Sequence, residues 1–365
     1  MKIGWKELLL QKYLSRKARP SRLHRFLKEK TAGVVPLFSP PFPGNSFKNG
    51  TGGPFLTKIQ AAAVQVELEP CRDPLDYAAK MQRCVDKAAS RGASLVVFPE
   101  NNGLMLLGML PVTGDLQREK YPAGSKVPPE ELPVEDIIRY SNPFVTRTAH
   151  LTFSYLAATY GLYIMAGSFM ELDEAARIVN RAYLYDPGGR LMGIQDKVHL
   201  FPTELKWGLS PGHNFRVFPS PLGTLSMPVC MDATYFETFR ILQLLGAEII
   251  MVPIADTGPY NFSLALRGTW SRVQEVPAYG VRSALVGSFA GFSFSGRAGL
   301  FAPLELSPAG DGILAETPEP AGEDMAVAEL DLEALREMRS AHPPYLGDTN
   351  LDLYRRYQPF LYRSL

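Results

Sequence analysis

The strongest constraint on the fold of this chain is an alternation of strand, helix and strand between residues 59 and 100. Residues 59–68 (IQAAAVQVEL) form an apolar run of strand length. Asp73 and Pro74 then supply a helix cap and a proline at the first helical position, and apolar residues recur at helical spacing until Gly92. A buried strand over 93–100 follows and ends at a proline and a carboxylate. Because strands joined through a helix pair in parallel, this segment predicts a layered α/β architecture.

Further elements are expected as far as about residue 340. Residues 101–143 are rich in proline, which favours loops of the kind that form lids or line binding sites. The periodicity predicts helices over 143–160 and 270–280, strands over 163–169, 248–253, 283–294 and 326–330, a hairpin of 178–185 with 190–199, and a short last helix.

Residues 1–30 are strongly basic, although the whole chain is nearly neutral. They carry ten Lys or Arg against two Glu, a net charge of +8, whereas the 365-residue chain has a formal net charge of +1. An apolar helical stripe can form from Ile3, Trp5, Leu8, Leu9, Tyr13 and Leu14. Three interpretations stay open: a helix packed on the body or on a partner subunit, an interfacial helix that touches anionic lipid, and a disordered basic arm. We expect no signal peptide, because a longer apolar region and a small-residue cleavage site are lacking.

Two other segments flank the expected folded body. Residues 31–56 contain ten Gly or Pro, which predicts an extended connector that lies on the body. Residues 341–365 form a tail with five aromatic residues: Tyr345, Tyr354, Tyr357, Phe360 and Tyr362. Since so many aromatic side chains are unfavourable in water, we expect the tail to pack on the body or on another subunit.

The composition excludes several classes of protein. Three cysteines (Cys71, Cys84 and Cys230) are too few for a disulfide framework, which favours a reducing, cytoplasmic location. No CxxC or His-rich spacing indicates a metal site. The near-neutral net charge gives no sign of a nucleic-acid partner, and no apolar run is long enough to span a bilayer. Cys71 and Cys84 lie before and inside the first predicted helix and are interpreted as structural.

Cys230 has a different sequence context. A short apolar run, interpreted as a strand, ends at this cysteine, and a helical pattern begins at Tyr235 and ends at Gly246. A thiolate at a strand-to-helix turn is stabilised by the helix dipole, and nearby backbone N–H groups can hold an oxyanion. A lone cysteine is nevertheless more often a buried structural residue, so only partners elsewhere in the chain favour a nucleophile.

Such partners exist in two other segments. Glu100 ends the strand over 93–100, and Lys197 ends the second arm of the predicted hairpin. Together, FPE at 98–100, DKVHLFPTE at 196–204 and VCMDATYFE at 229–237 resemble, in order and context, the three signatures of the nitrilase, or carbon–nitrogen hydrolase, superfamily. The likeness covers about residues 57–340.

The resemblance implies an α-β-β-α sandwich whose two sheets pack face to face, with a Glu-Lys-Cys triad at their ends. Carried over position by position, Glu100 is the general base, Lys197 the stabilising cation and Cys230 the nucleophile. Glu204 matches a further glutamate that positions the lysine and the substrate, and the Met231 backbone N–H is expected to help hold the oxyanion. The predicted reaction needs neither a metal nor an organic cofactor, and the resemblance implies at least a homodimer.

Other polar residues near these motifs are interpreted as structural. We expect His199 to orient its loop, because the motif context assigns the base to Glu100. Asp232 and Glu237 are interpreted as carboxylates at helix starts. The Cys-Met-Asp sequence at 230–232 is closer to amidase-type members than to true nitrilases, but Met231 and Tyr235 depart from the common pattern, as does the stretch 272–277.

The sequence therefore predicts a cysteine-dependent hydrolase of a linear, non-peptide amide or carbamoyl C–N bond. One alternative is an N-acyltransferase that passes the same thioester to an amine, for which the basic amino-terminal helix would suit a lipid or macromolecular acceptor. Another is a binding protein on an inactive hydrolase body. The substrate is expected to be a small molecule.

Overall fold

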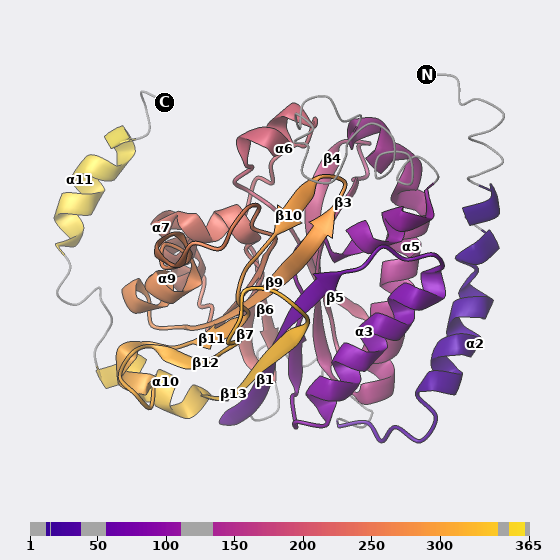
Figure 1. Cartoon of the computed structure of the whole chain (residues 1–365). Coiled ribbons are helices and arrows are strands. Elements are labelled where there is room, and N and C mark those ends of the chain that lie inside the picture. Colours follow the sequence, from indigo (N-terminus) through magenta and orange to yellow (C-terminus); the bar gives the residue numbers. More distant parts are fainter. Residues whose placement is uncertain (1–11, 15, 38–55, 111–133, 342–349, 362–365) are drawn as a thin grey trace.

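A computed structural model describes residues 12–14, 16–37, 56–110, 134–341 and 350–361 of the chain. The helices are α2 (Pro20–Lys30), α3 (Pro74–Ala89), α5 (Val134–Tyr160), α6 (Pro202–Lys206), α7 (Phe236–Leu244), α8 (Phe262–Ala265), α9 (Thr269–Glu275), α10 (Leu332–Ala341) and α11 (Leu351–Leu361). Short 3₁₀ helices are η2 (Asn102–Met109), η4 (Cys230–Thr234) and η5 (Leu304–Leu306). Figure 1 shows how these elements are arranged.

The strands form one strongly curved mixed sheet. They are β1 (Lys58–Leu68), β2 (Leu95–Val97), β3 (Tyr163–Leu172), β4 (Ile178–Tyr185), β5 (Leu191–Asp196), β6 (Val217–Ser220), β7 (Gly223–Ser226), β8 (Ile249–Ile254), β9 (Tyr279–Phe289), β10 (Phe292–Phe294), β11 (Gly299–Phe301), β12 (Ile313–Glu316) and β13 (Asp324–Asp331). Their order is β5-β4-β3-β2-β1-β9-β8-β7-β6, with β13 on β1, β10 and β11 on β9, and β12 on β11. The predicted parallel pairing of β1 with β2 is confirmed.

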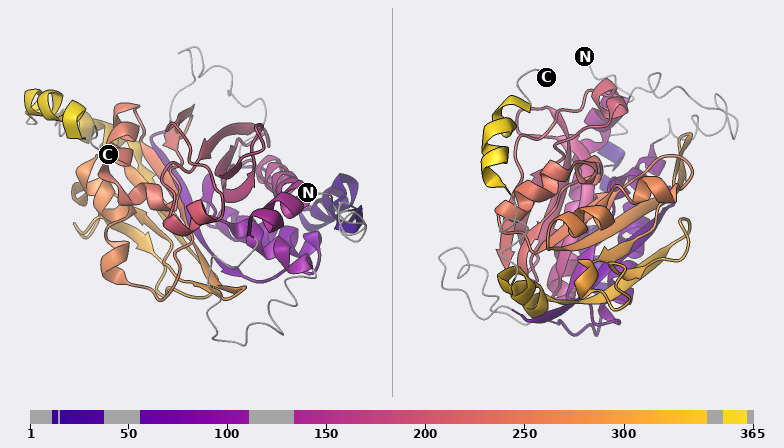
Figure 2. Two further views of the ribbon diagram at one scale, coloured as in Figure 1. Left: turned by 90° about the horizontal axis from the view of Figure 1, so that it is seen from above. Right: turned by 90° about the vertical axis from the view of Figure 1, so that its left-hand side faces the viewer.

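The two halves of this sheet pack face to face, and helices cover both outer faces (Figures 1 and 2). Alternate residues of β1 show why its sequence is an almost continuous apolar run. Ala61 and Ala63 lie in the core between the sheet halves, whereas Ala62 and Val64 lie in the core under α3 and α5. A third core lies between β8 and the helices α7 and α9. The predicted α-β-β-α sandwich is therefore confirmed.

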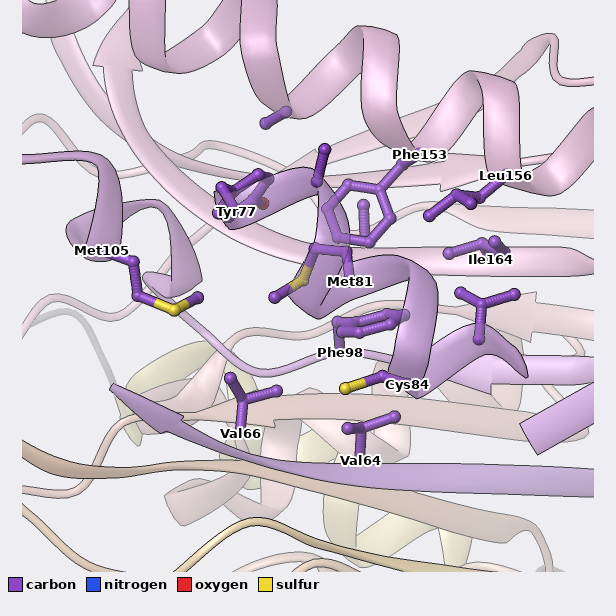
Figure 3. Close-up of a cluster of buried hydrophobic side chains, with 14 of the residues drawn as sticks. Val64, Val66, Tyr77, Met81, Cys84, Phe98, Met105, Phe153, Leu156 and Ile164 are labelled. Carbon is purple, nitrogen blue, oxygen red and sulfur yellow. The ribbon is translucent and has the colours of Figure 1, made fainter. Parts of the chain in front are cut away.

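The helix α3 begins as the sequence predicts. Asp73 accepts a hydrogen bond from the backbone N–H of Leu75 at 3.0 Å, and Asp76 accepts one from the backbone N–H of Asp73 at 2.9 Å. This reciprocal cap satisfies two donors that the helix itself leaves free. Figure 3 shows the apolar face of α3 packed between α5 and the sheet, with Cys84 among the buried side chains. Burial raises the pKa of Cys71 and of Cys84 to about 12 each, in accord with structural roles.

The part of the amino-terminal segment that the structure describes packs on the body. Leu23 and Leu27 of α2 join the core under α3 and α5, and Leu14 is buried there too. Arg22 donates to the Asp73 carboxylate at 2.9 Å, which ties α2 to the cap of α3. Ile3, Trp5, Leu8 and Leu9 lie outside the described residues. Val34 of the connector also packs against this core.

Several predicted boundaries are wrong, and in three cases tertiary packing outweighs a local signal. α5 begins at Val134, nine residues before the predicted start, and contains Pro143 in its interior. A proline costs a helix one hydrogen bond, but α5 buries an apolar face on both sides of it, at Ile138 and Phe144 among others. The residues 279 and 280, predicted as helix, begin strand β9 instead, and the predicted strand over 283–294 is two antiparallel strands, β9 and β10.

Two aromatic side chains of the carboxyl-terminal tail, Tyr354 and Tyr357, are not buried in this chain. Tyr354 and Tyr357 of α11 are about half exposed, and α11 projects from the body (Figure 2). The expected packing of the tail on the body is therefore not seen for these two side chains. Packing on another subunit stays a prediction. Tyr345 and Tyr362 lie outside the described residues.

Candidate active site

The five predicted site residues line one cavity of about 540 Å³. Glu100 follows β2 by three residues, Lys197 comes directly after β5, and Glu204 lies in α6. Cys230 and Met231 begin the 3₁₀ helix η4. The strand before Cys230 ends at Ser226, four residues earlier than predicted, so a short extended segment carries the cysteine into the cavity.

Close packing against β3 fixes the backbone of Glu100. Gly167 adopts a φ of 79°, and a Cβ atom there would lie only 2.0 Å from the Pro99 carbonyl oxygen. Glycine is therefore required for Pro99 and Glu100 to approach β3 this closely. Glu100 forms a β-bridge with Ser168, and the Asn101 N–H donates to the Ser168 carbonyl at 2.8 Å. The carboxylate is thus held on a rigid strand end.

Lys197 joins two buried carboxylates. Its Nζ lies 2.9 Å from Glu100 Oε1 and 2.8 Å from Glu204 Oε1, and the three side chains are almost fully buried. Although burial lowers the pKa of Lys197, the negative charges around it, led by Glu100, raise that pKa more, so the ammonium stays protonated. Burial raises the pKa of Glu204, and the Lys197 charge opposes the rise.

Asn180 is a member of this group that the sequence motifs did not indicate. Its Nδ2 donates to Glu100 Oε1 at 2.8 Å and lies 3.4 Å from Glu204 Oε1. Its main-chain carbonyl accepts a hydrogen bond from the main-chain N–H of Lys197 at 2.8 Å. It lies inside β4 (IVNRAYLY), whose residues are all buried, and an asparagine within such a strand is the signal that could have indicated it. The side chain orients both glutamates toward the lysine.

The backbone of Cys230 is in the left-handed region, with a φ of 46°. That conformation is costly for a residue with a Cβ and is typically held in place by its surroundings. It places the cysteine at the start of η4, whose first N–H groups have no acceptor within the helix. The Met231 N–H, next in the chain, is therefore suited to bind an oxyanion formed at the cysteine.

Asp232 connects the cysteine turn to the loop after Lys197. Its fully buried carboxylate accepts hydrogen bonds from the main-chain N–H groups of Val229 at 2.9 Å and His199 at 2.7 Å. The Nδ1 atom of the His199 ring also lies 2.9 Å from this carboxylate. The His199 ring also stacks on Tyr235, with ring centroids 4.3 Å apart. Asp232 thus has a wider role than the predicted helix-start carboxylate, whereas Glu237 lies in the first turn of α7 as predicted.

The thiol of Cys230 is neutral in the resting site. Burial raises its pKa well above the ordinary value, Glu100 raises it further, and the Lys197 ammonium lowers it. A thiol in this state needs a base to become a nucleophile. Glu100 is the carboxylate that supplies that base in the predicted arrangement, and Lys197 stabilises the charge that results.

Four more ionisable residues line the cavity, and the sequence analysis missed all of them: Asp256, Tyr260, Arg267 and Arg282. Asp256 follows β8 by two residues, and its Oδ1 lies 3.8 Å from Cys230 Sγ. Arg282 of β9 is buried and donates to Glu316 at 2.8 Å. Asp256 had a usable signal, because it follows a buried strand just as Glu100 does, and ligand sites favour the carboxyl ends of strands.

The carbon-nitrogen hydrolase family profile matches residues 60–340, which is most of the chain. The chain belongs to the carbon-nitrogen hydrolase family. The resemblance drawn from the three motifs is thereby confirmed.

Among curated relatives of this carbon-nitrogen hydrolase family member is a probable hydrolase, YhcX, from Bacillus subtilis. It is 28% identical over 302 residues, which cover 81% of this chain but only 54% of that relative. A nitrilase from Pyrococcus abyssi is 29% identical over 77% of this chain and 93% of its own length. Omega-amidase NIT2 from Xenopus tropicalis is 25% identical over 79% of this chain and 94% of its own length.

Solved structures of an amidase from Nesterenkonia sp. AN1 share the fold. One, in which the acetamide moiety of fluoroacetamide is covalently added at the active site cysteine, superposes with a TM-score of 0.59 at 20% identity, over 82% of this chain and 96% of that one. Within the described ranges, no cluster of three or more His, Cys, Asp or Glu could hold a metal ion. None of the helices in those ranges is long and apolar enough to cross a membrane.

Proposed function

We propose that this protein is a cysteine-dependent amidohydrolase that cleaves a linear, non-peptide amide or carbamoyl C–N bond of a small molecule. The observation that carries the proposal is the position of Glu100, Lys197 and Cys230 on one cavity, with Lys197 paired to two buried glutamates. The relatives named as an omega-amidase and a nitrilase support the reaction class.

The reaction begins with proton transfer from the Cys230 thiol to Glu100. The thiolate attacks the carbonyl carbon, and the new C–S bond pushes the carbonyl electrons onto oxygen. Lys197 and the Met231 N–H stabilise this oxyanion. When the tetrahedral intermediate collapses, the C–N bond breaks, and Glu100 gives its proton to the departing ammonia or amine. A thioester on Cys230 remains.

Hydrolysis of the thioester completes the cycle. Glu100, again a carboxylate, removes a proton from water, and the hydroxide adds to the thioester carbon. Collapse breaks the C–S bond and releases a carboxylic acid, or a carbamic acid from a carbamoyl substrate, while the thiol regains the proton. Glu204 and Asn180 hold Lys197 and Glu100 in place throughout, and no metal or organic cofactor takes part in these steps.

The test is detection of the thioester. Wild-type protein and Cys230→Ala are mixed with a panel of small aliphatic amides, and ammonia release and intact mass are measured. We expect turnover and an acyl adduct on wild-type protein and neither on the variant. A Cys230→Ala protein that releases ammonia at the wild-type rate would refute the proposal. An adduct that is discharged only by added amines would instead identify an N-acyltransferase, and a thiol that forms no adduct with any amide would favour a binding protein.

A further inference from the structure

Asp256 brings a further carboxylate to the nucleophile, apart from the two that Lys197 holds. Its Oδ1 lies 3.8 Å from Cys230 Sγ, and its main-chain carbonyl is fixed by the Ser295 N–H at 3.1 Å. The side chain is exposed toward the cavity, and desolvation by the protein groups around it raises the pKa of the carboxyl. A bound ligand can therefore reach Asp256 directly.

Arg282 and Lys197 lie close enough for their charges to lower the pKa of Asp256, but their short contacts are with other groups. Lys197 contacts Glu100 and Glu204 at 2.9 and 2.8 Å. Arg282 donates through Nη2 to Glu316 at 2.8 Å and through Nε to the Arg297 carbonyl at 3.0 Å. Among the residues that the structure describes, Asp256 forms no ion pair within 4.0 Å, and its side-chain hydrogen-bond partner is the thiol alone.

A carboxylate that forms no ion pair and lies beside the nucleophile is a ready acceptor for a hydrogen-bond donor or a positive charge on a ligand. Arg267 adds one positive charge to the remaining wall, much of which is apolar, with Leu104, Leu107, Ile137, Leu264 and Phe292 among its residues. An apolar cavity of about 540 Å³ with one accessible carboxylate beside the nucleophile suits a compact ligand with one positively charged nitrogen close to the reacting carbon.

We propose that Asp256 is a specificity-determining residue that binds an ammonium group on the carbon next to the scissile carbonyl, so that the preferred substrates are amides of α-amino acids. The proposal rests on the proposed hydrolase function. In such an amide the nitrogen lies about 2.5 Å from the carbonyl carbon, from standard bond lengths and angles. In a reactive pose the carbonyl carbon lies about 3 Å from Cys230 Sγ. The ammonium nitrogen can then lie about 2.8 Å from Asp256 Oδ1, because Oδ1 and Sγ are 3.8 Å apart.

The experiment compares alaninamide with isobutyramide, in which a methyl group replaces the ammonium. At pH 7 the amine of alaninamide is mostly protonated. We expect wild-type protein to favour alaninamide at least tenfold in kcat/KM. Asp256→Asn, which keeps the shape and removes the charge, should lower kcat/KM for alaninamide about 10- to 100-fold and leave isobutyramide within about threefold. Asp352→Asn, which removes the same charge from the exposed helix α11, should change neither value.

Equal losses for both amides in Asp256→Asn would overturn the proposal and identify a residue that positions the thiol. Hydrolysis of isobutyramide without a preference for alaninamide would also overturn it, while leaving the hydrolase function intact. If neither amide reacts, the proposed function fails for these substrates, and binding decides the role of Asp256. Calorimetry on Cys230→Ala should then show alaninamide at least tenfold tighter than isobutyramide, and a second change of Asp256 to Asn should abolish the difference.

Discussion

Replacing Lys197 by methionine is the sharpest test of how the site is held together. The substitution keeps a long apolar stem but removes the charge between Glu100 and Glu204, whose side chains are 2% and 9% exposed. Asn180 touches both carboxylates, so they stay close after the lysine is lost. Breaking a buried ion pair from one side typically costs 3–5 kcal/mol of unfolding free energy, roughly, because the partner charge is left buried.

The penalty has a definite pH dependence. Two buried carboxylates side by side relieve their repulsion when one binds a proton, so the folded-state pKa of that carboxyl rises above the unfolded value of about 4.3. A group with a raised folded-state pKa contributes its full stability below the unfolded pKa, and that stability is lost as the pH rises toward the folded-state pKa. Keeping one proton bound in the folded state costs about 1.4 kcal/mol of unfolding free energy for each pH unit above the unfolded pKa. The cost is therefore at most about 5 kcal/mol at pH 8 and about 1 kcal/mol at pH 5.

Lys80→Met is a matched control. Lys80 is itself buried, with a side chain 5% exposed, and pairs with Glu69 at 2.7 Å and Glu323 at 2.8 Å. Those carboxylates are 65% and 36% exposed, so water solvates them when the lysine is removed. We expect a loss of about 1 kcal/mol or less for this variant.

The assay is urea unfolding of wild-type protein, Lys197→Met and Lys80→Met between pH 5 and pH 8. Lys197→Met should be destabilised more at pH 8 than at pH 5 by about 3 kcal/mol or more, whereas the Lys80→Met loss should be small and nearly constant. A Lys197→Met loss that does not depend on pH, or one equal to that of Lys80→Met, would refute the argument that Lys197 neutralises two desolvated carboxylates.

Three further predictions concern the thiol and the surface. Glu100→Gln should lower the rate of amide hydrolysis by roughly 10²- to 10⁴-fold. It should nevertheless speed iodoacetamide labelling of Cys230 at pH 8, because the Glu100 charge raises the pKa of the thiol. Slower labelling of the variant, measured by intact mass, would contradict this. In wild-type protein the labelling rate of Cys230 should keep rising through pH 9. Cys71 and Cys84, whose pKa values are raised to about 12, should stay unlabelled in the folded state. A labelling rate of Cys230 that reaches a plateau below pH 8 would show that its pKa is lowered instead. α7 exposes apolar side chains, among them Leu244, which is 65% exposed, and we propose that these side chains support the expected homodimer. Leu244→Asp should then shift the molar mass measured by light scattering toward that of the monomer. A wild-type protein that is itself monomeric would exclude this.

Much of the fold was predictable because its signals are local. The cap of α3, the parallel strands on either side of it and the turn between β4 and β5 each depend on residues a few positions apart. The boundaries failed where burial removed the periodicity. β9 is buried on both faces, so its sequence does not alternate, and Tyr279 and Gly280 look like the end of a helix.

The chemical groups of the site can be read from the sequence alone. Glu100, Lys197 and Cys230 each follow a strand in a recognisable motif, and motif order is retained however the chain folds. The tertiary structure decided how those groups are balanced. It brought Asn180 to Glu100 across 80 positions and Asp256 to Cys230 across 26. Electrostatic interactions act over distances in space, so which carboxylates are neutralised, and which one is left for a ligand, depends on contacts that a motif does not contain.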